Sequence, residues 1–250
     1  MSVMALIAFP DISFLALLAL LAGLLTLDDT SLAQTWFSQP LPAALLAGFF
    51  CGDPLTGLAI GLPLQLILAV NLPVGQSFTG EPAVATVAAV GASVLSGRTL
   101  MVPMVGAEPQ PFGFVGWMVL AAGSLSALGH FLVQAERRAH TLWMLEGHRT
   151  LRDGNLDRMA SLQARCLATT FLRGSLLVVL MLLFLLWAWI PLYQHLPLRL
   201  QQTLAILPWL LPGLGLGTLV DRYGRSRAWL WALAGLLLAL AMFQLPGVLA

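Results

Sequence analysis

Apolar residues fill most of the chain in long runs, and the interruptions between these runs divide it into candidate membrane segments. A helix that spans a bilayer needs about 20 consecutive apolar residues. Runs of that kind predict helices at 3–27, 112–134, 171–193, 203–220 and 228–249. Polar connections are expected at 28–39, 97–111 and 135–170, with the last of them helical. The pattern predicts an all-α, polytopic integral membrane protein.

The run at 40–96 is different, because prolines and glycines interrupt its apolar residues every few positions. Gly52, Pro54, Pro63, Pro73 and Pro82 are among these breakers. Their spacing predicts short, discontinuous half-helices in place of full spans. Transporters use such broken helices to build substrate sites near the bilayer midplane. A second proline- and glycine-rich segment, at about 205–217, is a candidate counterpart in the other half of the chain.

Polar side chains stand inside the broken run, at Asp53, Thr56, Gln65, Asn71 and Glu81. An ionisable group costs a few kcal/mol to place in a bilayer. Broken backbone at membrane depth is tolerated only where protein buries it or a water-filled cavity wets it. The pattern therefore favours a polar binding site within the membrane. The alternative is a set of loop residues at the level of the lipid headgroups.

Amides, hydroxyls and carboxylates make up this set of side chains, without Arg or Lys. A phosphate or carboxylate ligand is bound best by cationic groups, so an anionic substrate is disfavoured. A neutral polyol or sugar fits, because carboxylates and amides accept paired hydrogen bonds from adjacent hydroxyls. A cation is the alternative, although two acids are few for binding one. The histidines and cysteines show no metal-ligand spacing, and no catalytic constellation or cofactor motif stands out. We therefore expect a transport protein without a metal or cofactor, and not an enzyme.

Composition supports the membrane assignment, since 59% of residues are hydrophobic and 9% are charged, against about 25% charged in soluble domains. A net charge of +1 gives no indication of nucleic-acid binding. Polar stretches are too short for a separate folded domain. We expect residues 1–250 to form a single transmembrane permease domain in contact with membrane lipid.

Arginines give the orientation, because they cluster at 137–173 and at 222–227. The positive-inside rule places both clusters in the cytoplasm. The segment at about 135–170 is then a cytoplasmic amphipathic connection. Two interpretations of it stay open: a helix that lies on the bilayer surface, and a docking site for a soluble partner.

Short motifs in a fixed order then suggest a family. They are Leu27-Asp28-Asp29, Gln39-Pro40, Gly52-Asp53-Pro54-Leu55-Thr56-Gly57, Leu64-Gln65-Leu66-Ile67, Val74-Gly75, Asp153-Gly154-Asn155-Leu156 and Leu211-Pro212-Gly213-Leu214-Gly215. The ordered set resembles the IIC membrane subunit of mannose/sorbose-type sugar phosphotransferase systems over nearly the whole chain. By position, Gln65 and Glu81 fall where that family has a Glu and an Asp in its sugar-binding region.

This resemblance implies a function and a set of partners. The chain would bind and translocate a neutral hexose across the bacterial inner membrane, in an oligomeric assembly with a IID membrane subunit. Soluble IIA and IIB subunits would supply the phosphoryl group, which is not carried on this chain. Gln65 and the sequence Gly80-Glu81-Pro82 depart from the family pattern. A non-transporting scaffold or regulatory subunit of a degenerate phosphotransferase system is therefore the alternative.

Overall fold

The computed structural model describes residues 10–32, 34–68, 80–97 and 111–223, and all regular structure within these ranges is helical. Three helical segments there are long and apolar enough to cross a membrane. They are α1 (Ile12–Thr30), α5 (Pro111–Arg152), and the continuous run of α6 (Leu156–Phe184), the π-helical turn η3 (Leu185–Trp189) and α7 (Ile190–Gln194). The spans predicted at 112–134 and 171–193 lie within the second and third. The predicted loop at 97–111 and last span at 228–249 fall largely or wholly outside the described residues.

The predicted half-helices are present as three short elements. They are α2 (Pro40–Cys51), α3 (Pro54–Leu68) and α4 (Pro82–Leu95), with 12, 15 and 14 residues. At 1.5 Å per residue each is about 18–22 Å long, less than the roughly 30 Å of a hydrocarbon core. A proline opens each of them, where its missing N–H costs no helical hydrogen bond. These helices do not span a bilayer individually.

The run predicted as one span at 203–220 is broken only near its start, and from residue 207 to 217, where discontinuity was expected, it is one helix that continues through Pro212. The short helix α8 (Leu198–Leu204) is separated by a turn at 205–206 from α9 (Leu207–Tyr223). Within α9, a side chain at Gly215 would have its Cβ 2.3 Å from the backbone oxygen of Leu66 in α3. The backbones of α9 and α3 therefore approach each other closely at this glycine. The two broken segments lie against each other in the fold.

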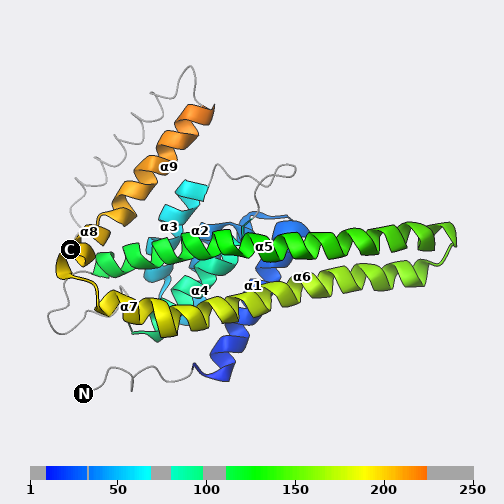
Figure 1. The fold of residues 1–250 in the computed structure, drawn as a ribbon, viewed down its shortest axis with the longest axis horizontal. Helices are drawn as coiled ribbons and strands as arrows, with labels where there is room; N and C mark the ends of the chain where they lie inside the picture. The colour runs from blue at the N-terminus through cyan, green and yellow to red at the C-terminus, as the bar shows by residue number, and fades with distance from the viewer. Residues whose placement is uncertain (1–9, 33, 69–79, 98–110, 224–250) are drawn as a thin grey trace.

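The helices α5 and α6 lie side by side and antiparallel along the longest axis of the molecule (Figure 1). With 42 residues, α5 is about 63 Å long. Helices α1 to α4 pack against one part of this pair, and the end with the 153–155 turn reaches beyond them. The polar segment predicted at 135–170 is thus the tip of a helical hairpin. It continues the axes of the spans and is not a separate helix that crosses them.

The centre of the core is α4, in which every residue from Ala83 to Ser93 is buried. A helix that is apolar on all faces requires neighbours on all sides, and α1, α2, α3, α5 and α6 supply them. At the end of the α5–α6 pair that lies away from the 153–155 turn, Trp117 and Trp189 stack with ring centroids 4.2 Å apart. Each indole N–H donates to the other residue's carbonyl oxygen, at 2.9 and 3.2 Å. This pair fixes α5 against η3.

Candidate functional site

The turn between α2 and α3 is held by Asp53. Gly52 ends α2 with a φ of +83°, which suits glycine. The carboxylate of Asp53 accepts hydrogen bonds from the Thr56 N–H at 2.9 Å and the Thr56 hydroxyl at 2.6 Å. Asp53 is 3% exposed and Thr56 is 1% exposed. The two predicted site residues therefore cap the first turn of α3, where an anionic group also meets the positive end of the helix dipole.

Gln65 lies near the other end of α3 and braces the start of α2. Its Oε1 accepts from the N–H of Leu41 at 3.2 Å, and its Nε2 donates to Oε1 of Gln39 at 3.4 Å. The first N–H groups of a helix have no partner within it, so an amide oxygen supplied from α3 satisfies one of them. Gln65 is half-buried. The sequence motifs Gln39-Pro40 and Leu64-Gln65 thus meet in space.

Glu81 stands at the start of α4, buried to 4% exposure. Its N–H donates to the carbonyl oxygen of Ser126 at 3.1 Å, and its own carbonyl accepts from Ala85 at 3.0 Å. Gly129 makes room on α5, because a Cβ there would lie 2.8 Å from the Cβ of Glu81. The backbone at Glu81 is therefore seated directly on the face of α5.

The carboxylate of Glu81 meets Arg173, which is 92 residues away in sequence. Arg173 Nη1 donates to Glu81 Oε1, and Arg173 Nε contacts Oε2 of Glu136 on α5. The three side chains have relative exposures of 9%, 5% and 12%. Around them, the Thr170 hydroxyl donates to Glu136, and His140 Nε2 lies 3.4 Å from the same carboxylate. We call Glu81, Arg173 and Glu136 the buried ion cluster.

Two hydrogen bonds of α1 place the start of α2 and the buried ion cluster at one end of the helical body. Ser38, two residues before α2, donates its N–H to Asp28 at 3.1 Å. Thr26 donates to the carbonyl oxygen of Thr170, one turn before Arg173, at 3.3 Å. Both contacts come from the last two turns of α1. Gln65, which braces the start of α2, and Glu81, which belongs to the buried ion cluster, therefore lie at the same end of the molecule.

The structure does not gather all predicted residues into one cluster. Thr56 and Gln65 are nine residues apart along α3, about 14 Å along its axis. Asp53 and Thr56 thus lie at the far end of α3, deep in the α2–α3 hairpin. Asn71 lies outside the described residues. The described residues of the predicted set therefore form two groups. Asp53 and Thr56 lie at the start of α3, and Gln65 and Glu81 lie toward its other end.

Sequence reasoning missed Arg173 and Glu136 as members of the site. Arg173 was counted among the arginines that set the orientation, yet apolar residues flank it in the stretch Thr170-Phe171-Leu172-Arg173-Gly174-Ser175-Leu176. An ionisable residue within an apolar run is itself a signal of a functional or paired group. Its partners could not be read from the sequence, since they come from two other helices.

Arg173 adds a cation to the predicted set of side chains, which had none. Two carboxylates surround this guanidinium, so the buried ion cluster carries a net charge of −1 when all three groups are ionised. Among the described residues, no group of three or more His, Cys, Asp or Glu side chains could hold a metal ion.

Comparisons with known proteins agree with this architecture. A family model described as the sorbose-specific IIC component of the phosphotransferase system matches residues 12–249. Among solved structures, one described as a membrane protein has a TM-score of 0.66 at 18% identity, with 95% of this chain and 97% of that chain covered. Another, the mannose transporter ManYZ in complex with microcin E492, has a TM-score of 0.57 at 18% identity and covers 93% and 95%.

At that level of identity, the two structures show a shared membrane-protein fold. A search of curated proteins gave no match. The family match extends over nearly the whole chain and is consistent with its multi-pass helical structure. The chain therefore belongs to the family of sorbose-specific IIC components of the phosphotransferase system, which are membrane transport subunits.

Proposed function

We propose that this chain is the sugar permease subunit of a mannose/sorbose-type phosphotransferase system in the bacterial inner membrane. It binds a neutral hexose-type sugar and translocates it. The observation that carries this proposal is the burial of polar side chains on short, broken helices of a IIC-family chain. Asp53, Thr56 and Glu81 are 3%, 1% and 4% exposed, although helices of 12 to 15 residues surround them.

The proposed sugar site contains Gln65, Asn71 and Glu81, with Asp53 and Thr56 shaping the turn behind it. The contact with Arg173 supports a binding role for Glu81, because the guanidinium fixes the orientation of its carboxylate. A carboxylate has about four lone-pair sites, and the Arg173 contact involves one of its two oxygens. Sugar hydroxyls are expected to donate to the remaining sites.

Translocation would follow alternating access, in which broken helices move against a scaffold of full spans. The contact of α9 with α3 supports a moving unit that contains both broken segments. The long helices α1, α5 and α6 are then the scaffold. The buried ion cluster joins the two parts, since Glu81 begins α4 while Glu136 and Arg173 lie on α5 and α6.

The proposed partners are a IID membrane subunit and soluble IIA and IIB subunits, in an oligomeric assembly within membrane lipid. Similarity to the ManYZ transporter supports a membrane partner. Phosphoryl transfer to the sugar takes place on the IIB subunit. The arginines of the hairpin tip favour a cytoplasmic location for it.

Uptake of radiolabelled hexoses into cells that co-express the IID, IIA and IIB subunits tests this function. We expect Glu81→Ala and Gln65→Ala each to reduce uptake by roughly tenfold or more, because each removes a hydrogen bond to the sugar from a buried site. Glu146→Ala, on the exposed hairpin, is the matched control and should leave uptake unchanged. Membrane levels of each variant are measured by quantitative immunoblot.

Two results would contradict the proposal at different levels. Full uptake with Glu81→Ala would show that the site assignment is wrong, while leaving transport in place. Absence of uptake by the unaltered chain, with every partner present and each of several hexoses supplied, would instead favour a non-transporting scaffold.

A further inference from the structure

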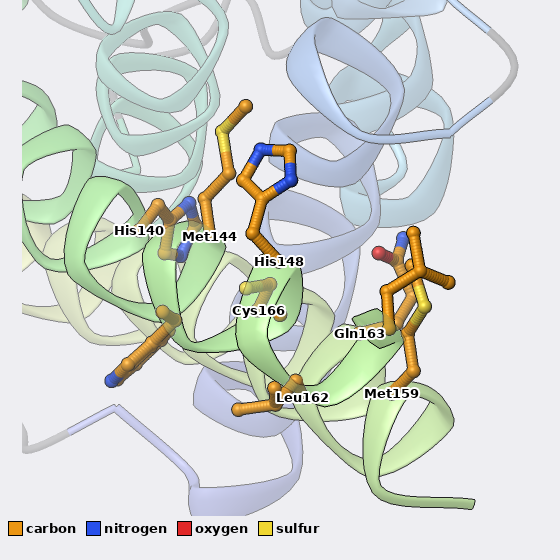
Figure 2. A pocket seen from close by; sticks show the side chains of 10 residues that line it. His140, Met144, His148, Met159, Leu162, Gln163 and Cys166 are labelled. Carbon is orange, nitrogen blue, oxygen red and sulfur yellow. The ribbon is translucent and has the colours of Figure 1, made fainter. Parts of the chain in front are cut away.

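The tip of the α5–α6 hairpin carries a hollow between its two helices, which we call the hairpin groove. Its volume is about 420 Å³. Figure 2 shows Met144 and His148 from α5, and Met159, Gln163 and Cys166 from α6, around this groove. None of its lining residues belongs to the proposed sugar site, and the proposed function gives it no role.

The groove is apolar and open to solvent. Among its lining residues, Met144, Leu151 and Met159 are 65%, 52% and 41% exposed. Clustered apolar surface outside a membrane marks an interaction site more often than isolated apolar residues do. Methionine suits such a surface, because its unbranched side chain adapts to the shape of a partner.

A second hollow, of about 510 Å³, adjoins the groove on α5 and shares His140 and Met144 with it. Arg137 and Arg138 line this second hollow. Among the described residues that line either hollow, none is Asp or Glu. The combined surface therefore has an apolar floor and a cationic margin.

Two acids on the hairpin helices are engaged with arginines. Glu136 contacts Arg173 within the body, and Glu146 pairs with Arg158 on α6 at 2.5 Å. Asp29 of α1 lies within electrostatic range of Arg137. Arg138 is exposed and is therefore the main source of positive charge at this margin. The positive charge at Arg138 is available to an external carboxylate.

Two other occupants fit the geometry less well. The apolar span of α5 ends at residue 134, and Leu151 lies 17 residues further, about 25 Å along the axis. Lipid headgroups extend only about 5–8 Å beyond the hydrocarbon core, so most of the groove is beyond their reach. A second copy of this hairpin would bring the same cationic margin, and like charges repel.

We propose that the hairpin groove docks a soluble protein through an acidic, amphipathic segment. Apolar side chains of that segment enter the groove beside Met144 and Met159, and its carboxylates pair with Arg138. Recognition of an amphipathic segment by an apolar groove with a charged margin is a common mode of protein association. The identity of the partner rests on the proposed function, in which the soluble IIB subunit must approach this face.

Binding of purified IIB subunit to the full-length chain in nanodiscs of zwitterionic lipid tests the proposal. We expect saturable binding that weakens as the salt concentration rises from 50 to 500 mM, because screening reduces charge pairing. Met144→Glu and Arg138→Glu should each raise the Kd by roughly tenfold, because the first places a charge in the apolar groove and the second reverses the charge that pairs with the partner's carboxylates.

Matched controls for both positions lie on the same helix. Leu145 is 56% exposed, and neither Leu145 nor Arg149 lines either hollow. Leu145→Glu and Arg149→Glu introduce the same changes and should leave the Kd within about twofold. These controls separate the groove from a general effect of added negative charge on the hairpin.

Three results would overturn the docking proposal. The first is that IIB does not bind the unaltered chain, and the second is that the groove variants and their controls bind IIB with equal affinity. The third is that brominated lipid chains quench a fluorophore attached at Met144→Cys, which would place the groove in the membrane. Sugar uptake by the unaltered system reports separately on the proposed function. Normal uptake with any of these results would therefore reject docking alone.

Discussion

At the scale of single residues, Arg173 connects three helices through charge. It reaches Glu81 at the start of α4 and Glu136 on α5, with 9% of its side chain exposed. Removing one member of a buried ion pair is costly because the charges left behind have neither water nor a partner. The cluster therefore contributes to stability only while it is complete.

Arg173→Met is expected to lower the free energy of unfolding by about 3–5 kcal/mol. The variant leaves two carboxylates together in a buried position, where their repulsion adds to the loss of solvation. Thermal unfolding of the detergent-solubilised protein measures the effect.

The control for that prediction is Arg158→Met, since Arg158 pairs with Glu146 where their side chains are 60% and 37% exposed. Such a surface pair contributes little to stability, because water screens both of its charges. Combining Arg173→Met with Glu81→Gln and Glu136→Gln should recover part of the loss. Equal destabilisation by the two arginine variants would show that the buried ion cluster has no special role.

Asp53, Gln65 and Glu81 show how far single positions could be assigned from the sequence. Asp53 stands between the breakers Gly52 and Pro54, and its hydrogen bonds to Thr56 hold the turn there. That information is local, because the capping atoms are three residues apart. The partners of Gln65 and Glu81 come from elsewhere in the chain, so no local pattern could identify them.

At the scale of helices, close backbone contact makes the α2–α3 hairpin possible. A Cβ at Gly57 would lie 2.4 Å from the backbone oxygen of Ala44 in α2. Without side chains in the way, two short helices pack tightly, as in membrane proteins generally. This packing positions the Asp53 turn deep in the fold.

Gly57→Ala is accordingly expected to destabilise the protein by about 1–3 kcal/mol, because the backbone atom that the new methyl group meets cannot move aside cheaply. Gly123→Ala is the matched control, since nothing lies within 4 Å of its added Cβ. That variant should be neutral or stabilising by up to about 1 kcal/mol through helix propensity. Denaturant unfolding in detergent compares them, and a similar loss for both would contradict the packing argument.

The division into long spans and short half-helices was predicted, whereas the full lengths of α5 and α6 and the course of the polar segment were not. The half-helices at 40–96 follow from prolines and glycines, which act on their own neighbours. For 135–170, helix was predicted, but a surface helix and a docking element stayed equal alternatives. The structure shows a hairpin that continues α5 and α6 outward (Figure 1). The direction of the hairpin follows from α5 and α6, the two membrane-length helices that it extends.

At the scale of the whole molecule, the long helices define two opposite ends. The 153–155 turn stands at one end, and the link between α7 and α8 stands at the other, 39 helical residues away along Leu156–Gln194. The arginine-rich end is expected in the cytoplasm, because cationic loops resist translocation. This orientation places the hairpin groove where a soluble partner can reach it.

Labelling of single cysteines with a membrane-impermeant maleimide tests the orientation, in a chain with Cys51→Ser and Cys166→Ser. Leu156 and Leu198 are suitable sites at the two ends, with 70% and 52% exposure. Leu156→Cys should react only in inverted vesicles, and Leu198→Cys only in intact spheroplasts. The opposite pattern would place the hairpin outside and leave the groove without access to soluble subunits.

The sequence by itself determined the membrane class, the division into long and broken helices, and an ordered set of motifs that identified the family. These properties follow from composition and from breakers that act over a few residues. Only the tertiary structure decided that Arg173 meets Glu81 across 92 residues, that Gln65 braces α2, and that the hairpin tip forms a groove. Each of these depends on which helix faces pack together, and no single stretch of sequence contains that information.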